Sequence, residues 1–174
     1  MADLFAAGWR TIDQLDALVG GYCWVERHLF ELTGEWASAG DSGQPWDAEL
    51  RVFFAAASLH HADVAARWSE RLAVRADVVR DALVVPPSGP LTDQLSALDH
   101  AGPGFTRLSG LVRAYLPCLV QAYSRHLAGA DPASEAPAMA VLGPACRSGS
   151  EEVARGQALF DEGVQRGWFV GLVG

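Results

Sequence analysis

The sequence contains no lysine, so thirteen arginines carry the fixed positive charge of its side chains at neutral pH. These arginines are spread along all 174 residues without forming a basic patch, and the formal net charge is −8. Nucleic acids and anionic membranes are bound through clustered positive charge. The sequence therefore disfavours both nucleic acid and membrane as partners.

Long apolar runs are also missing. No run reaches the ~18–20 residues that a membrane-spanning helix needs. The first residues carry acids and lack the basic-then-apolar layout of a secretory signal. Cysteine is scarce, and Cys23, Cys118 and Cys146 lie too far apart for the spacing of a metal cluster. We therefore expect reduced, buried thiols in a cytoplasmic protein.

The motifs of several common enzyme classes are absent. The sequence has no G-x-G-x-x-G or Walker-type loop for nucleotide phosphates. It also has no H-E-x-x-H, no G-x-S-x-G and no C-x-x-C. Any chemistry must therefore come from residues that the fold brings together.

The most regular stretch is residues 47–72, where apolar residues recur at spacings of three and four. This spacing marks one face of an amphipathic helix. The stripe has one gap, which His61 fills. Residues 11–36 carry a similar stripe, in which Glu26 occupies a core position. We therefore expect two long helices whose buried faces each present one ionisable side chain, with Thr11 or Asp13 as the cap of the first.

The second half of the chain predicts two more long helices, over residues 105–127 and 133–165. Pro117 lies inside the first of these and should kink it near Tyr115, because proline lacks a backbone donor. Asp131-Pro132 is typical of an N-cap followed by proline at the first helical position.

Composition also marks interruptions and connections. We expect a break or bend where glycine, proline and serine gather at residues 143–150, and docking of the apolar tail at residues 167–174 on the helices or on a partner. Residues 73–104 are rich in proline and glycine, with short helices at about 76–82 and 92–100. Two helix pairs joined by a long crossover have this layout. We predict a single all-α domain over residues 1–174.

This layout, with ligand-type residues on its core stripes, resembles the ferritin-like superfamily and its tRNA-hydroxylase-like branch. The resemblance covers residues 11–165 and implies a four-helix bundle that pairs with a second copy as a homodimer. In that family the helices supply a Glu, then E-x-x-H, then a Glu, then E-x-x-H around two metal ions. Glu26 matches the first carboxylate, and His61 matches the histidine of Ser58-Leu59-His60-His61.

The rest of the family's ligand set is incomplete here. Ser58 stands where the second helix would carry an acid, and the plausible position on the third helix holds Tyr115 or its neighbours. On the fourth helix only Glu151 or Glu152 is available, and no histidine follows. Because two metal ions need about six protein ligands, the sequence supports one metal ion at best.

Three functions follow from these observations. In the first, the dimetal site has degenerated, and the bundle interior binds or transforms a small organic molecule without a cofactor. Replacement of acids by Ser58, Gly149 and Ser150 would both remove ligands and open volume. A glutamate base oriented by a histidine would then supply acid–base chemistry. The candidate catalytic residues are Glu26, His61 and Tyr115.

The second function is the one that the resemblance implies, a non-haem iron- or manganese-dependent oxidase or hydroxylase. Its metal ligands would be Glu26, His61 and either Glu151 or Glu152, with oxygen at the open positions. The third function is a non-enzymatic helical interaction protein, whose dimer contact would be the apolar tail at residues 168–173.

Overall fold

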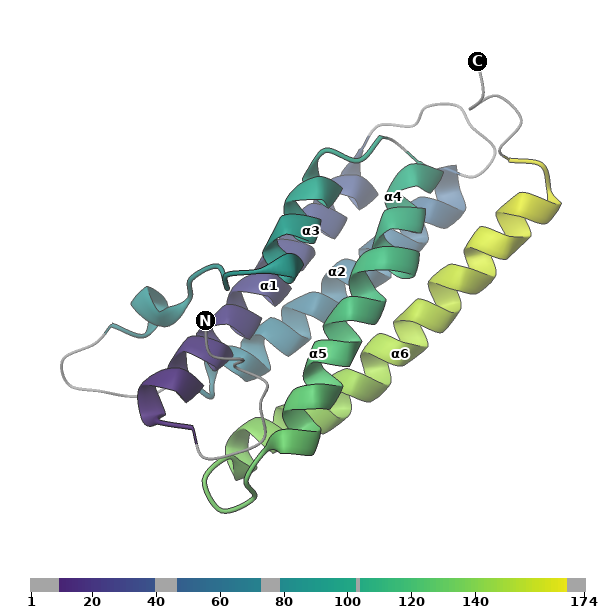
Figure 1. Cartoon of the computed structure of the whole chain (residues 1–174). Helices are drawn as coiled ribbons and strands as arrows, with labels where there is room; N and C mark the ends of the chain where they lie inside the picture. The colour runs from purple at the N-terminus through teal and green to yellow at the C-terminus, as the bar shows by residue number, and fades with distance from the viewer. Residues whose placement is uncertain (1–9, 40–46, 73–78, 103, 169–174) are drawn as a thin grey trace.

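The computed structural model describes residues 10–39, 47–72, 79–102 and 104–168, and these ranges contain helices and no strand (Figure 1). The predicted all-α class is therefore confirmed. No helix in these ranges is long and apolar enough to cross a membrane. The longest helices lie side by side: α1 (Ile12–Ser38), α2 (Asp47–Ser69), α5 (Leu116–Gly129) and α6 (Ala136–Gln165).

The core lies between these helices. α1 packs along α2, α5 packs along α6, and α2 also contacts α6. The largest fully buried side chains include Trp68 of α2 and Tyr123 of α5. Tyr22 of α1 joins them, with ring centroids 5.1 Å from Trp68 and 4.8 Å from Tyr123. The apolar stripes predicted from helical spacing are therefore the faces that meet in the core.

The start of α1 agrees with the sequence. The Thr11 hydroxyl accepts a hydrogen bond from the Gln14 backbone, and the Gln14 side chain accepts one from the Thr11 backbone. This reciprocal arrangement is a capping box. Further along α1, a Cβ on Gly20 would collide with the backbone oxygen of Leu83. Glycine at this position therefore permits the close approach of another backbone, as the Gly20-Gly21 pair suggests.

The connection from α2 to α4 carries two short helices. The first is the 3-10 helix η1 (Arg80–Leu83), and the second is α3 (Pro90–Asp99). A helix was predicted at about 76–82. Its residues 76–78 lie outside the described ranges, and the described helix η1 begins at Arg80. α3 begins two residues before the predicted start at Thr92, because Pro90 occupies its first turn.

The predicted helix over residues 105–127 is built from three consecutive helical segments. These are α4 (Phe105–Ser109), the π-helical segment η2 (Gly110–Tyr115) and α5. The disturbance predicted near Tyr115 therefore takes the form of wider helical turns that end just before Pro117. A proline withholds one backbone donor, and a π segment is a common way for a helix to accommodate such a change.

A break or bend was predicted at residues 143–150, and the break is wrong, because α6 runs without interruption through Pro144. Two serine hydroxyls in this part of α6 donate to backbone oxygens four residues earlier in the same helix: Ser148 to Pro144 at 3.0 Å and Ser150 to Cys146 at 2.7 Å. Packing of the buried face of α6 against the core outweighs the low helix propensity of this segment.

The predicted start of the last helix is also wrong. Asp131 does not cap α6; its carboxylate accepts hydrogen bonds from the Ala133 backbone and the Ser134 hydroxyl, which closes a turn. The helix begins at Ala136, with Glu135 as its N-cap residue. At the other end, Trp168 is buried and its ring lies 5.3 Å from that of Phe105, so the start of the tail docks on the helices as predicted. Residues 169–174 lie outside the described ranges.

Three glycines spaced seven residues apart let α6 approach its neighbour closely. A Cβ on Gly149 would lie 2.9 Å from Cγ2 of Val120, and a Cβ on Gly156 would collide with Cγ1 of Val112. A Cβ on Gly163 would collide with Phe105. Val120, Val112 and Phe105 lie in α5, η2 and α4. The consecutive segments α4, η2 and α5 are therefore in contact with α6 along most of their length.

We expect Gly156→Ala to destabilise the protein. The added methyl meets Val112 and also lies 2.9 Å from Cζ of Phe53. Overpacking of this kind costs about 1–3 kcal/mol, more than the ~1 kcal/mol that alanine gains over glycine in a helix. Urea unfolding followed by circular dichroism measures the change in free energy of unfolding.

The double variant Gly156→Ala/Val112→Ala is the control for this mechanism. Val112→Ala alone leaves a cavity and also destabilises. The double variant should nevertheless be more stable than the sum of the single losses, because one change makes room for the other. Additive losses would contradict the proposed steric contact.

Candidate functional site

Glu26 of α1 and His61 of α2 meet in the core. Nδ1 of His61 lies 2.6 Å from Oε2 of Glu26, and each residue is only 2% exposed. Both side chains occupy the buried stripe positions predicted from the sequence. A buried carboxylate is costly unless it is paired, and the imidazole supplies that partner.

Two tyrosines, Tyr115 at the end of η2 and Tyr123 in α5, lie near Glu26. The hydroxyl of Tyr123 donates to Oε1 of Glu26 at 2.5 Å, so both carboxylate oxygens have a partner. Tyr115 is fully buried, and its hydroxyl has no hydrogen-bond partner in the described part of the chain. Burial, together with the charge of Glu26, raises the pKa of both phenols above their ordinary value. They therefore stay neutral and act as donors.

Glu152 of α6 completes the cluster from the opposite side. Its Oε1 lies 3.4 Å from Nε2 of His61, and its Oε2 lies 3.6 Å from Nε2 of His60. Glu152 is fully buried, whereas Glu151 is exposed. Of the two predicted alternatives, the structure therefore brings only Glu152 to His61. The interior cluster consists of Glu26, His60, His61, Tyr123 and Glu152.

The two histidines of the cluster have opposite electrostatic surroundings. Burial by itself lowers the pKa of His61, but the charges of Glu152 and Glu26 outweigh it and raise this pKa to about 10. Burial lowers the pKa of His60 despite the nearby charge of Glu152. In the absence of a metal, His61 therefore holds a proton at neutral pH, whereas His60 is a neutral imidazole with a free lone pair.

Three buried polar atoms of the cluster have no hydrogen-bond partner among the described residues: Nε2 of His61 and both carboxylate oxygens of Glu152. Most buried polar atoms in proteins do have one. One ligand atom from each of His60, His61 and Glu152 lies within 4.8 Å of the other two. The ligand atoms of these three side chains therefore lie close enough together to hold a cation.

The three small residues that were expected to open a cavity, Ser58, Gly149 and Ser150, are either packed against neighbours or exposed. Val120 lies against Gly149, and Ser150 is exposed with its hydroxyl bonded to its own helix. Ser58 is buried and donates to the backbone oxygen of Phe30 at 2.9 Å. These small residues support close helix packing. They do not open the volume beside Glu26 that the first functional hypothesis requires.

Sequence reasoning missed His60 and Tyr123 as members of the cluster. His60 lies about a quarter-turn from the predicted stripe, and its contact with Glu152 depends on how α2 and α6 are aligned. Tyr123 was expected as ordinary core, although it lies two helical turns from Tyr115 on the same stripe. That shared face was the signal that could have placed it beside Glu26.

A second buried polar group lies near the ends of the long helices. Glu135 accepts from Arg10 at 2.7 Å and lies 2.8 Å from Nε2 of His126, which is fully buried. The ring of Tyr22 stacks on His126 with a centroid distance of 5.7 Å. The three cysteines are free, as predicted, but only Cys23 is buried; Cys118 and Cys146 are partly exposed, so the expectation of buried thiols is wrong for these two.

Comparison with known proteins does not assign a family. No protein-family model matches the chain, and neither a curated protein nor a solved structure matches it. The ferritin-like resemblance therefore remains a prediction from layout and residues. Function is inferred below from the geometry of the interior cluster.

We expect the stability of the metal-free protein to fall as the pH rises from 7 to 8.5. Folding raises the pKa of His61. Its contribution is therefore complete below the ordinary value of ~6.5 and is lost as the pH rises towards the folded value. A full difference of one proton changes the free energy of unfolding by about 1.4 kcal/mol per pH unit. Urea unfolding in the presence of a chelator measures this slope.

Most other titrating groups do not contribute to the slope between pH 7 and 8.5. The lowered pKa values of His60 and His126 act below this range, and the raised values of the buried tyrosines act above it. His61→Gln removes the titrating group and should flatten the slope, even though it lowers the stability itself. Equal slopes in both proteins would show that His61 is not the protonated group.

Proposed function

We propose that His60, His61 and Glu152 hold a single iron or manganese ion in a helical bundle of the ferritin-like type. The observation that carries this proposal is that one ligand atom from each of His60, His61 and Glu152 lies within 4.8 Å of the other two, while Nε2 of His61 and both oxygens of Glu152 make no hydrogen bond among the described residues. Two imidazoles and one carboxylate on one side of an ion are typical of non-haem iron(II) oxygenases. We infer that the protein is a metal-dependent oxidase or hydroxylase.

Charge also favours a cation at this position. Without a metal, the formal charges of Glu26, Glu152 and a protonated His61 sum to −1 in a buried place. A divalent ion that replaces the proton of His61 brings that sum to zero. Buried charge without compensation is expensive, so the cluster gains from a divalent ion more than from a proton.

Glu26 has a different role in this proposal from the one first expected. Its two oxygens are engaged by Tyr123 and by Nδ1 of His61, so it is a positioning residue and not a metal ligand. A carboxylate on one ring nitrogen fixes the tautomer and leaves the other nitrogen to face the ion. The same contacts weaken the alternative in which Glu26 acts as a free base, because both of its oxygens are already engaged.

A small cavity of about 130 Å³ reaches His60 of the cluster. It lies between α2 and α6 and is lined by His60 together with Asp63, Arg67 and Ser148. A bound iron or manganese ion would supply redox chemistry with dioxygen at positions that the protein leaves open. The surrounding residues hold the imidazoles in place and exclude bulk water. The small volume favours a small substrate.

The ferritin-like assignment is supported by the helix pairs α1–α2 and α5–α6, the long connection between them, and ligand-type residues on inward faces. Only one ion is proposed because η2 and α5, which take the place of the family's third helix, carry tyrosines where that helix would supply its glutamate. Homodimer formation is part of the same proposal and follows only from the family resemblance.

Metal content tests the ligand set directly. Protein reconstituted anaerobically with iron(II) or manganese(II) and desalted should retain about one ion per chain by elemental analysis. His60→Ala and Glu152→Gln should lose it, because each removes a ligand. Glu26→Gln should weaken binding about 10- to 100-fold, which is the usual effect of removing a carboxylate that orients a ligand.

Glu151→Gln is the matched control, since it removes the neighbouring exposed carboxylate from the same helix. It should retain the ion. Circular dichroism confirms that each variant is folded. Retention of the ion by Glu152→Gln, or no retention by the wild type, would contradict the metal centre.

Dioxygen uptake tests the inferred reaction class. Iron(II)-loaded wild type and Glu151→Gln should consume dioxygen faster than the same concentration of free iron, as measured with an oxygen electrode. Glu152→Gln should show only the rate of free iron. A loaded wild type that consumes no dioxygen would restrict the site to metal binding without oxidase chemistry.

A further inference from the structure

The three side chains proposed as metal ligands differ in their access to solvent. The side chain of His60 is 20% exposed, whereas that of His61 is 2% exposed and that of Glu152 is 1% exposed. Of the three, His60 is therefore the one that an ion arriving from solvent can contact first. The route of the ion into the cluster is the route to this imidazole.

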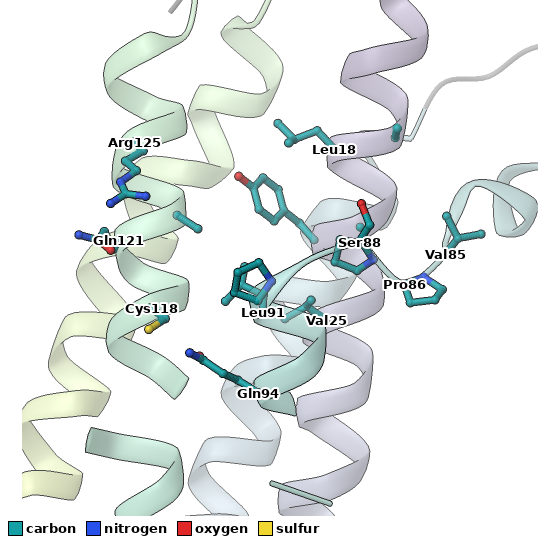
Figure 2. A pocket seen from close by; sticks show the side chains of 16 residues that line it. Leu18, Val25, Val85, Pro86, Ser88, Leu91, Gln94, Cys118, Gln121 and Arg125 are labelled. Carbon is teal, nitrogen blue, oxygen red and sulfur yellow. The ribbon is translucent and has the colours of Figure 1, made fainter. Parts of the chain in front are cut away.

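The cavity of about 130 Å³ between α2 and α6 reaches His60. Apolar side chains form much of its wall, with Val64 from α2 and Val141 and Ala145 from α6. A larger pocket of about 370 Å³ lies between α1, α3 and α5, and its described lining includes none of the three proposed ligands (Figure 2). Among the described residues, the smaller cavity is therefore the one that leads to the cluster.

Asp63 is the only carboxylate among the described residues that line this smaller cavity. It lies three residues after His60 on α2, and residues at this spacing are neighbours on one side of a helix. Its side chain is 59% exposed, so it is open to ions in solution. A carboxylate attracts a divalent cation. An ion held by Asp63 is therefore one helical turn from the first ligand of the cluster.

Arg67 competes with such an ion for Asp63. Its Nε and Nη2 atoms both lie 2.9 Å from Oδ2 of Asp63. The guanidinium also lines the cavity, where its positive charge opposes the approach of a cation. Exposed ion pairs of this kind contribute little free energy, so the pair opens readily and releases the carboxylate.

We propose that Asp63 is an entry ligand for the metal centre, which captures a divalent transition-metal ion in competition with Arg67 and passes it to His60. Asp63 does not belong to the group of ligand atoms that lie within 4.8 Å of one another, so it holds the ion only in transit. The ion leaves by the same route, and Asp63 therefore speeds loading and release equally. This proposal rests on the metal centre proposed above, but it concerns the rate of exchange and not the affinity.

Stopped-flow mixing of the metal-free protein with cobalt(II) tests the route, because coordination by protein ligands changes the visible absorption of cobalt(II). Asp63→Asn should slow loading about fivefold, the upper range for one exposed charge contact. Release into EDTA, at concentrations where its rate no longer depends on EDTA, should slow by the same factor. The dissociation constant and the content of about one ion per chain should then stay unchanged. Arg67→Gln should speed loading and release about threefold, because it frees the carboxylate.

Two controls separate a contact in transit from a general effect of charge. The double variant Asp63→Asn/Arg67→Gln should load as slowly as Asp63→Asn, because Arg67 acts through Asp63. Glu70→Gln removes another exposed carboxylate, which pairs with Arg71 and does not line the cavity. It should load at the wild-type rate in about 0.15 M salt, where exposed charges are screened beyond about 8 Å. Circular dichroism confirms that each variant is folded.

The failure of this proposal can be told apart from the failure of the metal centre. Loading of Asp63→Asn at the wild-type rate would exclude Asp63 from the route, although the centre itself would stand. Slower loading with unchanged release would also overturn the proposal, because it would show attraction at a distance and not a contact in transit. A wild type that takes up no cobalt(II), iron(II) or manganese(II) would overturn both the centre and its entry ligand.

Discussion

The arrangement of the helices depends on the buried charge of Glu26. This carboxylate on α1 is held by His61 from α2 and by Tyr123 from α5, and His61 in turn faces Glu152 from α6. One charged cluster therefore contacts all of the long helices. Apolar packing tolerates sliding of one helix along another, but a buried ion pair that loses a partner costs about 3–5 kcal/mol. The cluster thus favours one alignment of the helices over its neighbours.

Tyr22 links this cluster to the polar group at the helix ends. Its ring contacts Tyr123 on one side and His126 on the other. His126 pairs with Glu135, the N-cap residue of α6, and Glu135 binds Arg10 just before α1. The N-terminal end of α1 and the start of α6 are therefore joined by buried polar contacts.

Periodicity was enough to predict the long helices and the burial of Glu26 and His61, because spacing along one helix determines which face is buried. It was not enough for contacts that depend on alignment between helices. His60 lies off its stripe and reaches Glu152 only because α2 and α6 are close at that level. The continuity of α6 through Pro144 also could not be predicted, because it depends on packing of α6 against the core and not on local helix propensity.

The small residues of α6 explain why its carboxylate reaches the cluster. Glu152 lies between Gly149 and Gly156, and both glycines are in contact with side chains of the neighbouring rod, Val120 and Val112. A side chain at either glycine would move α6 outward. Because Glu152 lies 3.4 Å from His61, even a small displacement would take it out of reach of an ion shared with the imidazole. Close packing and the proposed metal centre therefore have the same structural requirement. Gly149, which the sequence suggested was the remains of a lost metal site, therefore helps to place the carboxylate of the proposed one.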